Sequence, residues 1–250
     1  MSATRPVRKV LVRGANWVGD AVMTIPALRE LRRIFVEAHI TLWTKPSLPD
    51  LFVEAEFIDD FLTAPAPAWR PTVAAIKSRS YDVAILFQNA FRAALVVFVA
   101  RVPLRCGYRT GGRGFLLTHA VPVDSGLKLQ HQVFYYLNLV AELERALTGQ
   151  THVNFDTPNL ALPVSLQRQR RGRAFLAEQG VDVGKALVVV NPGATNSRAK
   201  RWLPERFASV SDRLLERGDA SVVLIGAPEE IAWAQHIAAQ MRRRPLVLTG

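Results

Sequence analysis

The stretch Arg13-Gly14-Ala15-Asn16-Trp17-Val18-Gly19-Asp20 decides the fold of this chain. It follows an apolar run typical of a buried strand and precedes a helix-like pattern over residues 21–35. Such a turn places its side chains at the carboxyl edge of a parallel sheet, where these folds keep their sites. Its two glycines have the spacing of a phosphate-binding loop, but Asp20 stands where that loop carries lysine. A carboxylate repels phosphate and can accept a proton, so the turn indicates a base.

Apolar runs alternate with helix-like patterns along the rest of the chain, which predicts parallel βαβ units and an α/β fold. Strands are expected at residues 9–12, 40–44, 57–62, 83–87, 105–108, 186–190, 221–225 and 245–248. Helices are expected near residues 21–35, 47–55, 70–78, 91–101, 130–146, 166–179, 204–217 and 228–242. Pro26 is expected to kink the first helix or to start its second part.

The polar stretch over residues 148–163 lacks a helical period and contains Pro158 and Pro163, so it is predicted to be a linker. We therefore expect one domain over residues 1–150, a linker over 151–165 and a second domain over 166–250. Three strands make only half of a doubly wound sheet, so the second domain is expected to be cut short.

Composition excludes several classes of protein. The longest apolar run, residues 93–100, is far shorter than the ~20 residues that span a bilayer. Arg13 and Asp20 interrupt any signal peptide, and Cys106 has no second cysteine to pair with. These features favour the cytoplasm. The net charge of +11 suits phosphates or an anionic membrane surface, or an arginine-rich solvated surface. Nucleic acid is not an expected partner, because no basic helix or aromatic stacking platform is visible.

A second loop, Asn191-Pro-Gly-Ala-Thr-Asn-Ser-Arg-Ala-Lys-Arg-Trp202, directly follows an expected strand. It combines a glycine turn, small polar side chains and three basic residues, which suit a pyrophosphate. The alternative is a polar loop that leads into an amphipathic helix beginning near Pro204. A base on one domain and a cationic loop on another are the layout of a sugar-nucleotide transferase.

Six segments carry a family resemblance. They are RGANWVGDAVMTIPAL (13–28), FQNAFR (87–92), RVPLRCGY (101–108), HQVFYYLNLV (131–140), NPGATNSRAKRWLPERF (191–207) and GAPEE (226–230). In these segments the chain resembles the ADP-heptose:lipopolysaccharide heptosyltransferases of glycosyltransferase family nine, closest to the heptosyltransferase II branch. The resemblance implies two Rossmann-like domains in the GT-B arrangement.

The same resemblance implies an activity. It is inverting transfer of heptose from the donor substrate ADP-heptose to the lipopolysaccharide inner core, with no metal and no cofactor. The implied location is the cytoplasm, with peripheral contact at the inner face of the inner membrane. Two alternatives stay open: transfer of another sugar from a related donor, and a non-catalytic fragment that binds lipid A or another anion. The family's later Asp-Ser/Thr-Gly-x-x-His segment is missing, so weak donor binding by these 250 residues is expected.

The resemblance assigns site residues by motif. Asp20 matches the proposed general base, although an Asp at this turn can also be a helix N-cap. The donor-binding residues expected from the motifs are Thr195, Asn196, Lys200, Glu229 and Glu230, with Glu229 and Glu230 as alternatives for one acidic position.

The acceptor-binding residues expected on the first domain are Arg13, Asn16, Asn89 and Arg92, and turn chemistry is an equal explanation for the last two. His131 is expected to serve the start of a helix, and the aromatic residues 134–136 are expected to be core.

Overall fold

The computed structural model describes residues 6–63, 69–194 and 198–249, without the side chains of Lys128 and Arg198. The chain divides into two compact units, residues 1–163 and 164–250. Residues 151–163 therefore belong with the first unit, where Val153 is buried in the core. The two units are described separately below.

The first unit contains a six-stranded sheet with the order β3-β2-β1-β4-β5-β6. The strands are β1 (Lys9–Arg13), β2 (His39–Thr44), β3 (Asp60–Thr63), β4 (Val83–Leu86), β5 (Leu104–Tyr108) and β6 (His119–Val121). All neighbours pair in parallel. This is the strand order of a doubly wound Rossmann fold, in agreement with the Rossmann-like domains that the family resemblance implies.

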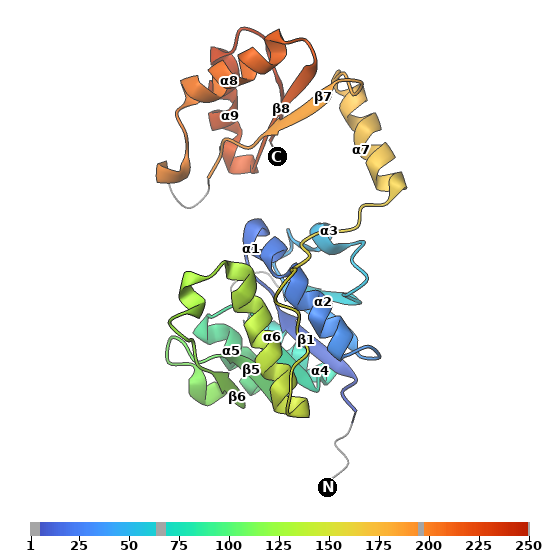
Figure 1. Cartoon of the computed structure of the whole chain (residues 1–250), viewed down its shortest axis with the longest axis vertical. Helices are drawn as coiled ribbons and strands as arrows, with labels where there is room; N and C mark the ends of the chain where they lie inside the picture. Colours follow the sequence, from blue (N-terminus) through green and yellow to red (C-terminus); the bar gives the residue numbers. More distant parts are fainter. Residues whose placement is uncertain (1–5, 64–68, 195–197, 250) are drawn as a thin grey trace. The chain divides into compact units, whose positions relative to one another are not determined.

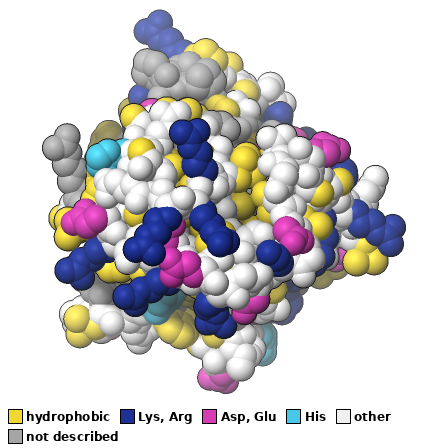
Figure 2. Space-filling model, turned by 90° about the horizontal axis from the view of Figure 1, so that it is seen from above, with side chains coloured by type: hydrophobic (Ala, Val, Ile, Leu, Met, Phe, Trp, Pro, Cys, Tyr) yellow, Lys and Arg dark blue, Asp and Glu magenta, His cyan; other side chains and the backbone are white. Residues whose placement is uncertain are grey.

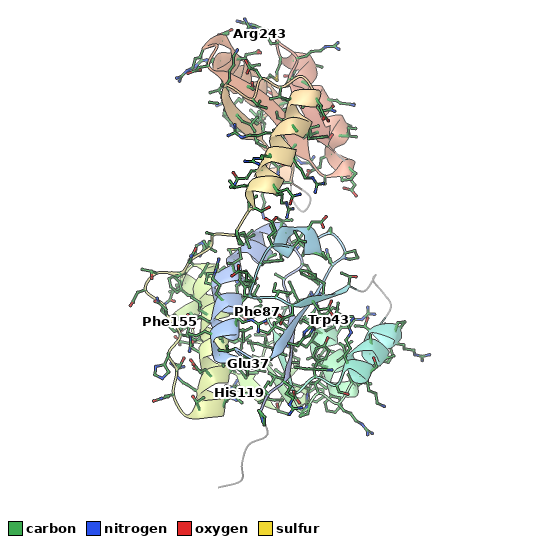
Figure 3. All side chains as sticks on the ribbon, turned by 90° about the vertical axis from the view of Figure 1, so that its right-hand side faces the viewer. Glu37, Trp43, Phe87, His119, Phe155 and Arg243 are labelled. Atoms are coloured by element: carbon green, nitrogen blue, oxygen red, sulfur yellow. The ribbon has the colours of Figure 1, made fainter. Side chains whose placement is uncertain are left out.

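Helices cover both faces of this sheet (Figure 1). They are α1 (Val18–Met23), α2 (Ile25–Ile34), α3 (Pro49–Phe52), α4 (Trp69–Arg79), α5 (Phe91–Val99) and α6 (Gln132–Thr148), with short turns η1 (Gly114–Leu116) and η2 (Leu127–Leu129). Val10 and Val12 of β1 join the core beneath α1, α2 and α6, and Leu11 joins the core beneath α4 and α5. This alternation follows from the two-residue period of a strand that is covered on both faces. Phe87 and Trp43 lie inside this unit (Figure 3).

Two expected elements of the first unit need correction, and one strand was missed. The third strand begins at Asp60, not at 57, because Phe57 is buried in the core beneath α2 rather than paired in the sheet. The expected helix at 47–55 shrinks to α3. The three-residue strand β6 was not predicted, because its pattern is too short to read from the sequence. The first helix does divide as expected, with Pro26 in the first turn of α2.

The second unit contains a parallel sheet with the order β7-β8-β9. Its elements are α7 (Leu166–Glu178), β7 (Ala186–Val190), η3 (Arg198–Lys200), α8 (Pro204–Glu216), β8 (Ala220–Gly226), η4 (Pro228–Glu230), α9 (Ile231–Gln240) and β9 (Leu246–Thr249). Asp212 of α8 accepts hydrogen bonds from the backbone N–H of Arg242, at 3.0 Å to each carboxylate oxygen, and so holds the turn before β9.

Two further observations concern the length of the helices and the charge of the surface. Across the described part of the chain, no helix is long and apolar enough to cross a membrane. Lys and Arg side chains are spread over the face drawn in Figure 2.

Candidate functional site

The strand order of the first unit reverses between β1 and β4. The chain leaves β1 into α1 on one face of the sheet, and it leaves β4 into α5 on the other. Connections that part in this way open a crevice at the carboxyl ends of the two strands, which is the usual ligand site of the fold. Asp20 follows β1 and Asn89 follows β4, so the topology brings both to this edge.

Asp20 is a half-buried residue in the first turn of α1. The N-cap is Trp17, with extended backbone angles of φ −111° and ψ 145°, so the N-cap explanation of Asp20 is wrong. Among the residues that the structure describes, no hydrogen bond or ion pair engages the Asp20 carboxylate. Burial raises the pKa of Tyr136 to about 12, and the negative charge of Asp20 contributes to that rise. Asp20 therefore lies near α6 with its oxygens available to a ligand.

Arg13 organises the turn that carries Asp20. The side chain is buried, and its guanidinium donates hydrogen bonds to the carbonyls of Gly14 at 2.8 Å and Trp43 at 3.1 Å, and to Asn16 Oδ1 at 2.7 Å. It also lies 4.8 Å from the centre of the Trp43 ring. Desolvation lowers the pKa of Arg13 to about 10. These contacts point the charge inward, so Arg13 holds Asn16 and the turn in place.

On the other side of the crevice, Asn89 is held between two side chains. Its Oδ1 accepts from Arg113 Nη2 at 2.8 Å, and its Nδ2 donates to the Tyr135 hydroxyl at 2.7 Å. Arg113 is fully buried and also donates to the carbonyls of Tyr108 at 2.8 Å and Gln88 at 2.5 Å. Desolvation lowers the pKa of Arg113. The loop after β4 is therefore fixed by a buried arginine.

A second tyrosine continues this network. The Tyr108 hydroxyl donates to the carbonyl of Tyr135 at 2.7 Å and accepts from Asn138 Nδ2 at 3.0 Å. Asn138 also lines a pocket of about 580 Å³ at the same end of α6. The other lining residues are Asp124, Leu127, Gln130, Phe134 and Phe155. The network thus extends from the loop after β4 to this pocket.

Sequence reasoning missed Arg113 and misplaced Tyr135. Tyr135 was expected in the core, but it is half-buried and its hydroxyl reaches Asn89, whereas its neighbour Tyr136 is buried as expected. Arg113 lies in a glycine-rich loop that reads as surface, and no local pattern shows that it turns inward. Arg92 is exposed on α5. His131 is the N-cap of α6, as expected, and accepts from the Val133 N–H at 3.4 Å.

In the second unit, the loop after β7 is held by Trp233 and Arg201. The Trp233 indole donates to the carbonyl of Pro192 at 3.1 Å, and Arg201 donates to the carbonyl of Ala194 at 3.1 Å. The Arg201 guanidinium also lies 5.4 Å from the centre of the Trp233 ring. Lys200 is exposed beside this loop. The other two predicted donor-loop residues, Thr195 and Asn196, lie outside the described residues.

Glu229 and Glu230, the two candidates for one acidic donor-binding residue, differ in exposure. Glu229 is exposed, whereas Glu230 is 8% exposed. Glu230 Oε2 accepts from the Ala227 N–H at 3.1 Å, and its Oε1 is buried with no hydrogen-bond partner among the described residues. A Cβ on Gly193 would lie 2.2 Å from this carboxylate, so only glycine fits there. Glu230 is therefore the acidic residue that the fold holds at the carboxyl edge of β7 and β8.

No group of three or more His, Cys, Asp or Glu side chains that could hold a metal ion occurs within the described ranges. The residues gathered at the strand ends are a free carboxylate, amides, a phenol and, in the second unit, a buried carboxylate beside basic residues. Such groups suit proton transfer and the binding of a polar, anionic substrate.

The chain has two Rossmann-like α/β units, each with polar side chains at the carboxyl edge of its sheet, which is the architecture of the domains of GT-B glycosyltransferases. Residues 69–250 match the family described as glycosyltransferase family 9 (heptosyltransferase). The chain therefore belongs to that family, and the predicted fold class and transferase class are confirmed.

The chain is also similar to individual heptosyltransferases. The lipopolysaccharide heptosyltransferase 2 of Escherichia coli (strain K12) is 27% identical over 241 residues, which cover 93% of this chain and 67% of that protein. The solved E. coli ADP-heptose lipopolysaccharide heptosyltransferase II superposes with a TM-score of 0.81 at 22% identity, over 96% of this chain and 72% of that one. The E. coli heptosyltransferase WaaC, solved with ADP, gives a TM-score of 0.68 at 16% identity, over 96% of this chain and 74% of that one.

Proposed function

We propose that the protein transfers heptose from ADP-heptose to the inner core of lipopolysaccharide, with inversion at the anomeric carbon. The observation that carries the proposal is Asp20, a half-buried carboxylate at the strand-order reversal that no described residue engages. Family membership and the names of the relatives, which are heptosyltransferases for lipopolysaccharide, support this choice of sugar and acceptor.

In this proposal Asp20 is the general base. An acceptor hydroxyl attacks the anomeric carbon of the donor from the side opposite the diphosphate. Its proton passes to the Asp20 carboxylate as the new C–O bond forms. The bond between the anomeric carbon and the diphosphate breaks, and its electron pair leaves with ADP. A positioned base of this kind contributes ~10²–10⁴ in rate.

The first unit would hold the acceptor and the second the donor. Asn16, Asn89 and Arg92 would contact acceptor oxygens or anionic groups, and Arg13 would act by positioning Asn16. On the donor side, Lys200 with Thr195 and Asn196 would stabilise the diphosphate as it leaves.

Glu230 would bind donor hydroxyls. Its Oε1 is an acceptor without a described partner, and a ribose or sugar hydroxyl would supply the missing hydrogen bond. Glu229 is exposed and is the weaker candidate. We further propose that the protein works in the cytoplasm, on a lipid-linked acceptor at the inner face of the inner membrane.

Replacement of the base tests the proposal. Asp20→Asn keeps the size of the side chain and removes its basicity. We expect turnover of this variant to fall by ~10²–10⁴ while acceptor affinity stays unchanged. The readout is release of ADP together with the mass gain of a truncated inner-core acceptor.

Asp156→Asn is the matched control, because Asp156 is an exposed carboxylate in the segment that follows α6. Near-normal turnover of Asp20→Asn would remove Asp20 from the chemistry. Absence of heptose transfer by the unaltered protein would overturn the proposed activity itself.

A further inference from the structure

The outward side of α5 is unusual for a surface helix. The helix buries Ala93, Ala94, Val96 and Val97 against the sheet, as expected. A surface helix normally turns polar side chains to solvent. On α5, however, Phe91 and Phe98 are each 44% exposed and Val99 is 40% exposed. The helix is therefore apolar on the side that faces away from the sheet.

The turn η1 extends this apolar surface. Phe115 is 75% exposed, and its ring centre lies 6.1 Å from that of Phe91. At the far end of α5, the Arg105 guanidinium lies 5.4 Å from the Phe98 ring and donates to the carbonyl of Leu116 at 2.8 Å. These contacts join α5 and η1 into one surface. We name it the α5–η1 surface, defined by Phe91, Phe98, Val99 and Phe115.

The chain segment that forms this surface carries charge of one sign. Residues 83–123 contain five arginines and no aspartate or glutamate. Arg92, Arg101 and Arg109 are exposed, Arg105 is half-buried and Arg113 is buried. The α5–η1 surface therefore combines exposed aromatic rings with exposed arginines of the same chain segment.

Arg101 stands where the backbone favours glycine. Its φ is 60°, and it is the residue after Ala100, the C-cap of α5. Arg101 N donates a hydrogen bond to Phe98 O at 2.9 Å, and Val102 N donates one to Val97 O at 3.1 Å. This is a Schellman ending, in which the left-handed residue is usually glycine. An exposed arginine at a strained position suggests that its side chain has a use beyond the fold.

We propose that the α5–η1 surface docks on an anionic lipid bilayer. Aromatic rings lie well at the boundary between headgroups and acyl chains, and nearby arginines attract anionic headgroups. Phe91 directly follows the loop that holds Asn89, so docking would bring the acceptor side of the crevice to the bilayer surface. The inference is consistent with a lipid-linked acceptor, and so rests on the proposed function, but lipid binding itself requires neither donor nor transfer.

Vesicle sedimentation tests the surface. The probes are vesicles of phosphatidylcholine alone and of phosphatidylcholine with phosphatidylglycerol. We expect the protein to bind the anionic vesicles and not the neutral ones. Arg109→Glu should weaken binding at least about fivefold, the effect of one cationic side chain near such a surface. Phe115→Ser should also weaken it severalfold.

Two matched variants control for charge and apolar area elsewhere. Arg217→Glu makes the same charge change at an exposed arginine of the second unit, and Val36→Ser removes a side chain that is 66% exposed. Both should bind vesicles like the unaltered protein. Circular dichroism and thermal melting should show that all four variants are folded.

Three results would overturn the inference: equal binding to both vesicle types, equal losses in the control variants, or a dimer in sedimentation velocity that Phe115→Ser dissociates. The last would make a second copy the occupant of the surface. Transfer to a delipidated inner-core acceptor separates the two proposals. Vesicle binding without transfer would contradict only the enzymatic function, and transfer without vesicle binding would contradict only the docking surface.

Discussion

Asn89 Nδ2 donates a hydrogen bond to the Tyr135 hydroxyl, at 2.7 Å. The direction of this bond follows from Arg113, which can only donate and therefore faces Asn89 Oδ1 at 2.8 Å. The Tyr135 oxygen is thus an acceptor toward Asn89, and its own O–H has no acceptor among the described residues. Burial raises the pKa of Tyr135 against the opposing effect of the Asn89 hydrogen bond, so the phenol keeps its proton. Tyr135 is therefore able to donate a hydrogen bond to a ligand.

Tyr135→Phe removes only that donor. If the donor meets an acceptor-substrate oxygen, we expect the acceptor KM to rise about threefold to tenfold, the effect of one neutral hydrogen bond, with kcat and the donor KM nearly unchanged. Steady-state kinetics with each substrate varied in turn measures this.

Tyr108→Phe is the control for this change. Its hydroxyl makes two internal hydrogen bonds, so its loss should lower the free energy of unfolding by about 1–3 kcal/mol without a selective effect on acceptor KM. An acceptor KM that stays the same in Tyr135→Phe would show that its hydroxyl only supports Asn89.

Glu230→Gln keeps the shape of the side chain but removes the charge that would bind donor hydroxyls. A hydrogen bond to a charged group contributes about 1.5–3 kcal/mol, so ADP-heptose should bind roughly tenfold to a hundredfold more weakly. Calorimetric titration measures this, and Glu229→Gln, at the exposed neighbouring position, should bind like the unaltered protein. Weaker binding of ADP-heptose by Glu229→Gln than by Glu230→Gln would assign the donor contact to Glu229.

Arg101→Gly should stabilise the protein. A left-handed backbone costs a residue with a side chain about 1–2 kcal/mol relative to glycine, so chemical denaturation should show a gain of that size. Ser80, with φ 54°, offers the same test. Ser80→Gly should also stabilise, but only Arg101→Gly should weaken binding to anionic vesicles. A loss of stability in Arg101→Gly would mean that the arginine side chain itself supports the fold.

The hydrogen bonds of Glu144 are expected to make part of the protein's free energy of unfolding sensitive to acid. Burial by itself raises the pKa of Glu144, but hydrogen bonds from Arg33, the His152 N–H and Thr151 outweigh it and hold the pKa at about 2, below its ordinary value of 4.5. The Arg33 contact is 3.0 Å, and the other two are 2.8 and 2.7 Å. Because the folded pKa is depressed, the stabilisation is present above about pH 4.5 and is lost as the pH falls toward 2.

The size of this effect is about 3 kcal/mol from the difference in pKa. Urea denaturation across this range should therefore show the unaltered protein and Glu144→Gln converging in stability as the pH falls. Glu142→Gln is the control, since Glu142 forms an ion pair with Arg145 on the more exposed side of α6. A difference in the free energy of unfolding between the unaltered protein and Glu144→Gln that stays constant over the whole pH range would contradict this pH dependence.

The sequence by itself determined the α/β class, the order of most elements and the turn that carries Asp20. These features depend on local patterns: short apolar runs, helical periods, and glycine positions between them. The strand 186–190 was predicted with its observed bounds, because its apolar run ends at a polar loop.

Only the tertiary structure decided how side chains meet. Asn89 and Tyr135 are 46 residues apart, and no local pattern shows their pairing. Arg113 turns inward because the carbonyls of two strand ends surround it, and Glu230 rather than Glu229 is buried because Gly193, on another strand end, leaves room for its carboxylate. These contacts join segments that are distant in sequence, so they depend on the packing of the completed sheet.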